Sequence, residues 1–123
     1  MTDPNFIILY VRDPSASTAF YADVLGRAPV EASPTFAMFA LSSGVMLGLW
    51  SRDNVAPAAT AQPGGAELAI TVPDADAVRA AHADWSRRKL PIAQGPTAMD
   101  FGYTFVALDP DGHRLRVFAP AAP

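Results

Sequence analysis

The fold is decided by residues 109–118, which read DPDGHRLRVF. The first four residues are strong turn formers, because proline presets φ and glycine tolerates a positive φ. The residues that follow alternate in side as a strand does, so Leu115 and Val117 share one face. Arg114, Arg116 and Phe118 share the other face. Arginines on a strand inside a small protein require an explanation, and the rest of the chain supplies part of it.

The composition indicates one compact domain, residues 1–123. The chain has 123 residues, of which half are hydrophobic, enough for a real core. A net charge of −3 and a pI near 5.1 give no reason to expect nucleic acid as a partner. The absence of cysteine excludes disulfides, thiolate metal sites and cysteine nucleophiles. A polar N-terminus and the lack of a membrane-length apolar run predict a soluble, cytoplasmic protein with no membrane partner.

The first half of the chain is expected to form a strand, a helix and three strands. Residues 6–11 are a β-branched and aromatic run typical of a buried strand. Asp13 or Ser15 then caps a helix that Gly26 ends. Further strands are expected at 28–32, 35–41 and 45–50. This part, residues 5–50, is module one.

The second half repeats this order after a linker. Residues 51–65 are rich in Ala, Pro and Gly and differ in composition from the rest, so we interpret them as the linker. Module two, residues 66–119, is expected to hold a strand, a helix and three strands. Their expected bounds are 67–72, 74–89, 91–97, 103–108 and 114–118.

The two halves are also similar in sequence. The segment FIILYVRD at 6–13 corresponds to ELAITVPD at 67–74, and GVMLGLW at 44–50 corresponds to GHRLRVF at 112–118. An internal repeat of this length says more than any single motif. It predicts an α+β protein made of a duplicated βαβββ module.

The chain resembles the vicinal oxygen chelate superfamily, which includes glyoxalase I, extradiol dioxygenases, fosfomycin-modifying enzymes and bleomycin-binding resistance proteins. The resemblance rests on the strand ending VRD at 11–13, a helix signature at Ser17, 20–21 and 25–26, and the ending DPDGHRL at 109–115. It covers nearly the whole chain. It implies two tandem βαβββ modules whose curved mixed sheets surround a shared cleft, usually within a homodimer. Because members include metalloenzymes and metal-free binders, the site must decide the function.

The ligand positions implied by the resemblance are mostly filled by residues that do not bind metals. Metal-dependent members place His or Glu on the first and last strands of each module. In this chain these positions hold Phe6 and Gly48 in module one, and Glu67 and Arg116 in module two. A divalent centre needs about three converging oxygen or imidazole ligands, and only Glu67 is one. We therefore expect no metal and no cofactor, an expectation that a one-residue register error would upset.

No other residues are expected to supply a metal site or a catalytic group. His82 lies beside the core stripe of the second helix, and His113 lies on the strand face opposite Arg116. The chain has no credible Ser-His-Asp order, no phosphate-binding glycine loop and no paired carboxylates on one element. A general base at Glu67 is disfavoured, because the adjacent arginine favours a permanently ionised carboxylate.

Strand alternation predicts a cleft face that is aromatic and rich in methionine. The face contains the implied ligand positions, their neighbours two residues along, and the penultimate strands aligned by the repeat. The expected ligand-binding residues are Phe6, Ile8, Tyr10, Phe36, Met38, Gly48, Trp50, Glu67, Tyr103, Phe105, Arg114 and Arg116. Aromatic rings around a few polar groups are typical of a small-molecule site and can stack on a planar ligand. The same rings could instead fill a collapsed cleft or a dimer interface.

Glu67 and Arg116 are expected to be neighbours, because the first and last strands of a module pair in this fold. A lone buried charge is costly, so the two side chains could bond to each other. Alternatively Arg116, together with Arg114, binds an anionic or carbonyl group of a ligand. Gly48 on the corresponding strand of module one would leave room for that ligand.

The leading hypothesis is a metal-free small-molecule binding protein of the bleomycin-resistance type. A homodimer would take up an aromatic or amphipathic molecule in an apolar cleft and sequester it. The second hypothesis is a metal-dependent glyoxalase-like lyase or an extradiol dioxygenase-like enzyme with an atypical ligand set. The third is a structural or regulatory dimer without a ligand.

Overall fold

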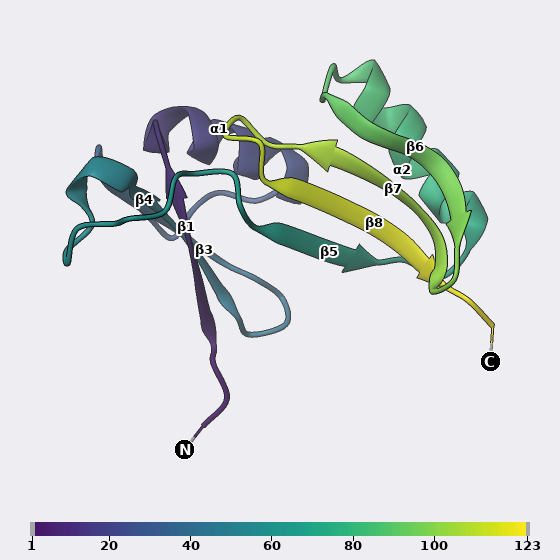
Figure 1. Ribbon diagram of the computed structural model, residues 1–123, viewed down its shortest axis with the longest axis horizontal. Coiled ribbons are helices and arrows are strands. Elements are labelled where there is room, and N and C mark those ends of the chain that lie inside the picture. The colour runs from purple at the N-terminus through teal and green to yellow at the C-terminus, as the bar shows by residue number, and fades with distance from the viewer. Residues whose placement is uncertain (1, 123) are drawn as a thin grey trace. The chain divides into compact units, whose positions relative to one another are not determined.

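The computed structural model describes residues 2–122 of the chain (Figure 1). The chain divides into two compact units, of which unit one ends at Gly65 and unit two begins at Ala66. Unit one contains β1 (Phe6–Val11), α1 (Pro14–Leu25), β2 (Glu31–Ala32), β3 (Phe36–Ala40) and β4 (Met46–Ser51). Unit two contains β5 (Glu67–Thr71), α2 (Ala75–Arg87), β6 (Ile92–Met99), β7 (Gly102–Leu108) and β8 (Arg114–Pro120).

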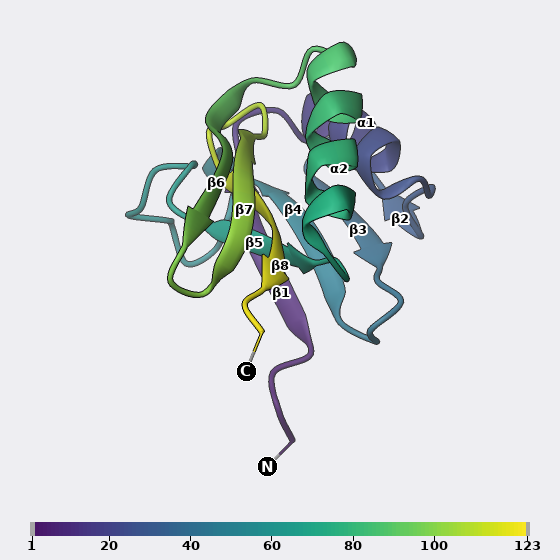
Figure 2. The same ribbon diagram turned by 90° about the vertical axis from the view of Figure 1, so that its right-hand side faces the viewer.

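Both units have the same topology. The sheet of unit one has the strand order β1-β4-β3-β2, and the sheet of unit two has the order β5-β8-β7-β6. In each sheet the first strand runs parallel to the last, and the other pairs are antiparallel. Figure 2 shows β6, β7 and β8 side by side. The predicted α+β fold with two βαβββ modules is therefore confirmed, and the shared cleft that the resemblance implies stays a prediction.

Helix α1 begins and ends where its capping residues dictate. The side chain of Asp13 accepts hydrogen bonds from the backbone N–H groups of Ser15, at 3.0 Å, and Ala16. Gly26 ends the helix with φ at 66°, a left-handed conformation that suits glycine. The helix packs on β3 and β4 and buries Ser17 and Tyr21. Of the two expected capping residues, Asp13 is the one that caps.

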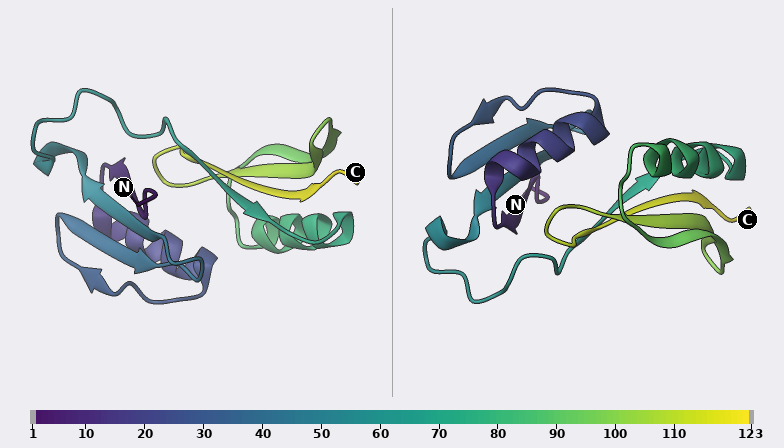
Figure 3. Two further views of the ribbon diagram at one scale, coloured as in Figure 1. Left: turned by 90° about the horizontal axis from the view of Figure 1, so that it is seen from below. Right: turned by 90° about the horizontal axis from the view of Figure 1, so that it is seen from above.

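Helix α2 covers one face of the second sheet. The carboxylate of Asp74 caps it by accepting a hydrogen bond of 2.8 Å from the N–H of Ala77. The helix packs on the sheet that contains β6, β7 and β8 (Figure 3). It buries Val78 and Trp85. None of the helices described in residues 2–122 is long and apolar enough to span a membrane.

The segment expected to be a linker, residues 51–65, lies within unit one and has structure of its own. It contains a short 3₁₀ helix, η1 (Arg52–Asn54), and Val55 behind it is buried. The Nε group of Arg52 donates a hydrogen bond of 3.4 Å to the carbonyl of Ala61. The segment therefore contains a short helix, a buried side chain and a hydrogen bond between two of its own residues.

The turn at 109–112 is organised by one buried carboxylate. One oxygen of Asp109 accepts hydrogen bonds of 2.9 Å from the N–H groups of both Asp111 and His113. The other oxygen lies 2.8 Å from Nδ1 of His113. Gly112 has φ at 89°, a conformation that most other residues avoid. The turn thus aligns β7 with β8. This pairing sets the positions of the two arginines on β8.

Candidate functional site

One face of the sheet in unit one holds a group of aromatic and apolar side chains. The register pairs Ile8 with Gly48 and Tyr10 with Trp50, while β3 pairs Phe36 with Trp50. Side chains at paired positions point to the same side of a sheet. We call this group the aromatic face; it consists of Phe6, Ile8, Tyr10, Phe36, Met38, Gly48 and Trp50. The other face packs against α1 and supplies the buried side chains of Leu9, Val11, Ala37, Phe39, Leu47 and Leu49.

The rings of the aromatic face are only partly covered. Phe36 and Trp50 meet edge to face, with ring centroids 6.2 Å apart. Both rings are half-buried, and Phe6 and Ile8 beside them are 40% and 43% exposed. Exposed ring surface of this kind can be covered by a planar molecule, because offset and edge contacts between aromatic groups are favourable.

Gly48 does not leave an open space for a ligand, which corrects the expectation from the sequence. A Cβ atom added to it would lie 2.9 Å from Cε1 of Phe6 and 3.1 Å from the ring of Phe36. The two phenyl rings therefore close over the glycine. The role of the glycine is to let these rings lie against the backbone of β4, which the sequence alone could not show.

In unit two, Glu67 and Arg116 bond to each other. The Nε group of Arg116 donates to Oε2 of Glu67 at 3.0 Å, and Nη2 donates to Oε1 at 3.4 Å. The Nη1 group donates to the hydroxyl of Thr104 at 3.3 Å. Of the two interpretations left open by the sequence, the structure contains the mutual ion pair. The pair holds Arg116 in place, and with the Glu67 side chain 39% exposed it contributes little to stability.

Tyr103 and Phe105 do not lie on the same face as Arg116, contrary to the prediction. Phe105 pairs with Val117, has no exposed surface and packs its ring 5.4 Å from that of Trp85 in α2. Tyr103 faces the same helix, where the guanidinium of Arg79 lies 5.4 Å from its ring centroid. Hydrogen bonds to Asp76 and to Tyr103 raise the pKa of Arg79. Both aromatic residues therefore belong to the helix side of the sheet.

The error is a slip of one residue in β7. Strand β7 pairs Thr104 with Phe118 and Val106 with Arg116, as β3 pairs Phe36 with Trp50 and Met38 with Gly48. The true equivalents of Phe36 and Met38 are therefore Thr104 and Val106. Because side chains alternate, one residue of slip moves every side chain to the other face. The sequence YTFVAL of β7 is mostly apolar on both faces. The pattern of residue types therefore does not show which of its side chains face the helix.

Two aromatic residues near the arginines of β8, Phe101 and Phe118, were not among the expected ligand-binding residues. The ring of Phe101 lies 5.8 Å from that of Phe118, and the guanidinium of Arg116 lies 5.5 Å from the centroid of Phe101. Alternation along β8 had placed Phe118 on the face of the two arginines, although not in the site. Phe101 lies in a turn, where no periodic signal exists.

The same side of unit two contains a pocket of about 340 Å³. The residues that line it are Ala93, Gln94, Met99, Val106, Arg114 and Arg116. Arg114 and Arg116, which were both expected to bind a ligand, therefore line the same pocket. Its walls combine positive charge with an amide, a thioether and aliphatic carbon.

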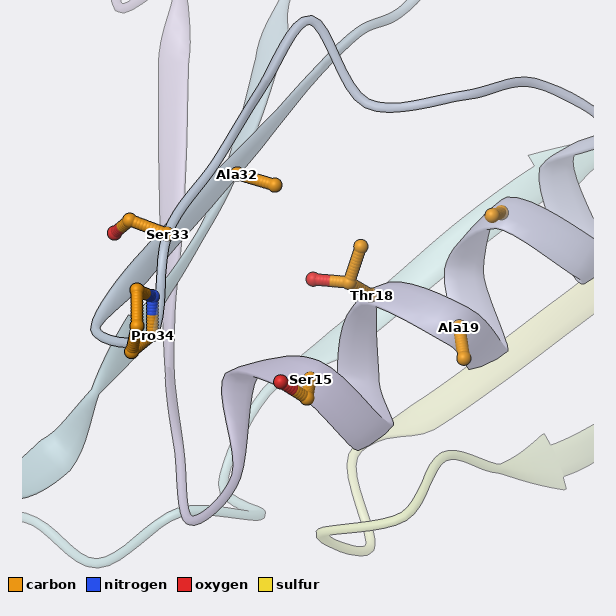
Figure 4. A pocket seen from close by; sticks show the side chains of 7 residues that line it. Ser15, Thr18, Ala19, Ala32, Ser33 and Pro34 are labelled. Carbon is orange, nitrogen blue, oxygen red and sulfur yellow. The ribbon is translucent and has the colours of Figure 1, made fainter.

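A second pocket, of about 460 Å³, lies in unit one between α1 and the connection from β2 to β3 (Figure 4). It is lined by Ser15, Thr18, Ala19, Ala22, Ala32, Ser33 and Pro34. The hydroxyl of Ser33 is engaged in the turn, since it bonds the carbonyl and the N–H of Phe36 at 3.1 Å. The lining lacks charged and aromatic side chains, so this pocket has little to recognise a ligand with.

The residues at the implied metal positions do not fit a divalent cation. Phe6 and Gly48 have no donor atom, and the carboxylate of Glu67 is bonded to Arg116. Within residues 2–122, one group of metal-ligand types is found, formed by Asp109, Asp111 and His113. The carboxylate of Asp109 and the imidazole there are buried and bonded to each other inside the turn, which makes this group structural.

Two βαβββ units with mixed four-stranded sheets define a glyoxalase-like α+β protein. The family model of the Glyoxalase/Bleomycin resistance protein/Dioxygenase superfamily matches residues 4–117. The chain belongs to this superfamily, as its resemblance to vicinal oxygen chelate proteins predicted.

Individual relatives agree with this assignment. The phenazine antibiotic resistance protein EhpR of Enterobacter agglomerans is 31% identical over 117 residues, which cover 93% of this chain and 89% of EhpR. A protein of Agrobacterium tumefaciens with a solution NMR structure is 51% identical, with a TM-score of 0.86 over 99% of this chain and 100% of that one. A glyoxalase-related enzyme of Fulvimarina pelagi is 25% identical, with a TM-score of 0.82 over 97% and 88% of the two chains.

Proposed function

We propose that this protein binds a planar aromatic small molecule and sequesters it without turnover, in the manner of a bleomycin-resistance protein. The observation that carries the proposal is the aromatic face of unit one. The edge-to-face pair of Phe36 and Trp50 presents half-buried rings beside the exposed side chains of Phe6 and Ile8. Covering such a surface with a flat apolar molecule removes apolar area from water and adds ring contacts.

The name of one relative supports the same class of ligand. EhpR is named a phenazine antibiotic resistance protein, and phenazine is a flat tricyclic aromatic. The match spans 93% of this chain. We therefore take a phenazine-like molecule as the ligand class, since its flat faces suit the rings of the aromatic face.

The residue chemistry supports sequestration over catalysis. Three of the four implied metal positions hold Phe6, Gly48 and Arg116, which are not ligands for a cation. The fourth, Glu67, is held in a two-point ion pair, in which both of its carboxylate oxygens accept hydrogen bonds from Arg116. Elemental analysis of protein purified without chelator tests this part. Stoichiometric Ni, Zn, Mn or Fe would overturn it and favour a metalloenzyme.

Tryptophan fluorescence tests ligand binding directly. The chain contains two tryptophans, Trp50 on the aromatic face and Trp85 in the core of unit two. In a Trp85→Phe variant the remaining emission comes from Trp50, and phenazine is expected to quench it saturably. The matched Trp50→Phe variant keeps only the buried indole, and its emission is expected to respond weakly. Absence of saturable quenching by phenazine and by other planar aromatics would contradict the proposal.

We also propose that the protein is a homodimer, as is usual in this superfamily. The expected molar mass in light scattering is twice the chain mass of 13.0 kDa. A monomer at micromolar concentration would contradict the dimer and leave the binding proposal to be judged by fluorescence.

A further inference from the structure

Met99 is the most exposed methionine in the described part of the chain, residues 2–122. It is the last residue of β6, which lies at the edge of its sheet, and it is 44% exposed. Met38 and Met46 are half-buried. An oxidant must touch the sulfur in order to react with it, so exposure decides which thioether reacts first. Met99 is therefore the methionine of this part of the chain that a dissolved peroxide reaches most easily.

The sulfur of Met99 already faces a hydrogen-bond donor. The Nε2 group of Gln94 donates to Sδ of Met99 at 3.7 Å. Thioether sulfur is a weak acceptor, so this bond satisfies the amide poorly. Both residues belong to β6, and both line the pocket of about 340 Å³ in unit two. The donor is thus in place before any oxygen is added to the sulfur.

The same pocket contains more hydrogen-bond donors than acceptors. Arg114 and Arg116 line it together with Gln94, and its lining includes no carboxylate. Within residues 2–122, the guanidinium of Arg114 has no hydrogen-bond or ion-pair partner. A guanidinium and an amide together present many N–H groups, and the lining answers them with one amide oxygen and one sulfur. A new oxygen with negative partial charge would therefore be stabilised here.

We propose that Met99 is a redox-modification site, at which a peroxide forms a methionine sulfoxide whose oxygen accepts a hydrogen bond from Gln94. In this step a lone pair of the sulfur attacks one oxygen of hydrogen peroxide, and the O–O bond breaks. The sulfur is oxidised by two electrons, and the hydroxide that departs takes the proton of the transferred oxygen and leaves as water. This chemistry does not depend on the ligand proposed for the aromatic face.

The surroundings of Met99 make its sulfoxide unusual. Oxidation of methionine commonly disrupts packing, because it turns an apolar side chain into a polar one. At this position the new oxygen meets the amide of Gln94 and the positive charges of Arg114 and Arg116. The three rotatable bonds of methionine let the oxygen turn toward the amide. The modification therefore makes one wall of the pocket polar without leaving the oxygen unpaired, and sulfoxide reductases can reverse it.

Peptide mapping by mass spectrometry after brief treatment with hydrogen peroxide tests the site of oxidation. The peptide that contains Met99 is expected to gain an oxygen before the peptides that contain Met38 and Met46. The matched control is the same protein unfolded in urea, in which these three methionines are expected to react at similar rates. Oxidation of Met38 or Met46 before Met99 in the folded protein would overturn the proposal.

Urea unfolding of the reduced and oxidised protein tests the bond to Gln94. The background carries Met38→Leu and Met46→Leu, so that Met99 is the methionine left to oxidise within residues 2–122. Oxidation is expected to change the folding equilibrium constant about fivefold more favourably in this protein than in its Gln94→Leu variant, which is the usual net effect of one hydrogen bond. The matched control Gln62→Leu removes the same amide from an exposed position and is expected to keep the full effect.

Every outcome of the unfolding experiment bears on the sulfoxide site. An effect of oxidation that is the same with and without Gln94 would overturn it. An effect that Gln62→Leu also abolishes would show that the amide acts without local contact, which overturns it as well. Gln94→Glu is the second variant, because a carboxylate cannot donate and repels the sulfoxide oxygen. Oxidation is expected to destabilise that variant, and an unchanged urea midpoint there would count against the proposal.

Discussion

The buried carboxylate of Asp109 is expected to be the most sensitive position in the turn that organises unit two. It has no exposed side-chain surface, and its two oxygens accept three hydrogen bonds, two from backbone N–H groups and one from the imidazole of His113. Truncation in Asp109→Ala removes all three bonds. It also leaves buried donors without a partner, which is the costly part of losing a hydrogen bond.

The magnitude follows from these contacts. Removing one partner of a buried, charge-assisted group costs about 3–5 kcal/mol. Natural domains unfold with free energies of about 5–15 kcal/mol, so Asp109→Ala removes a large part of the total. The Asp109→Asn variant keeps one oxygen for the two backbone N–H groups and changes only the atom facing His113. Its expected cost is therefore smaller, about 1–3 kcal/mol.

Urea unfolding measures these differences as shifts of the midpoint at unchanged slope. The matched control is Asp53→Ala, because the side chain of Asp53 is 90% exposed and such changes cost within about 0.5 kcal/mol. A loss below about 1 kcal/mol in Asp109→Ala would refute the reasoning, since it would show that the three bonds contribute little net free energy. Equal losses in the Asn and Ala variants would show that the charge, and not the number of acceptors, is what matters.

Three further predictions concern the faces of the two sheets. Phe105→Ala is expected to lower the free energy of unfolding by about 3–5 kcal/mol, and a loss below about 1 would contradict its place in the core. Glu67→Gln is expected to cost less than about 1 kcal/mol in urea unfolding, because its ion pair with Arg116 is partly exposed; a larger loss would mean a dominant structural role. Gly48→Ala is expected to displace the two phenyl rings over it, to cost about 1–3 kcal/mol and to shift the emission of Trp50. Unchanged emission would show that the rings do not support the indole.

Local signals account for the part of the fold that the sequence predicts well. Helix α1 follows from Asp13, which caps its first turn, and from Gly26, which ends it in a left-handed conformation. The repeat between residues 6–13 and 67–74 predicted equivalent first strands, and both pair in parallel with the last strand of their unit. Turn chemistry at 109–112 predicted the hairpin of β7 and β8. The helix caps and the turn depend on neighbours in sequence, and the equivalence of the two first strands follows from the repeat.

The face on which a site residue lies was predicted well where a turn next to the strand determines the register. On β4 and β8 the preceding glycine turns fix the alternation, so Trp50 and Arg116 were placed on the expected faces. Strand β7 has no such anchor and carries apolar residues on both sides, so Phe105 was assigned to the wrong face. The pairing with Val117 decides its side, and that pairing is a long-range contact which no local pattern encodes.

The sequence by itself therefore determined the duplicated α+β fold, the capped helices and the lack of metal ligands at the implied positions, because these depend on residue identity and local periodicity. Only the tertiary structure decided how the side chains meet. It showed that two phenyl rings close over Gly48, that Glu67 holds Arg116, and that Arg114 has no partner within residues 2–122. Such facts depend on distances between strands far apart in sequence. The arginines of residues 109–118 are thereby explained as one fixed and one available charge.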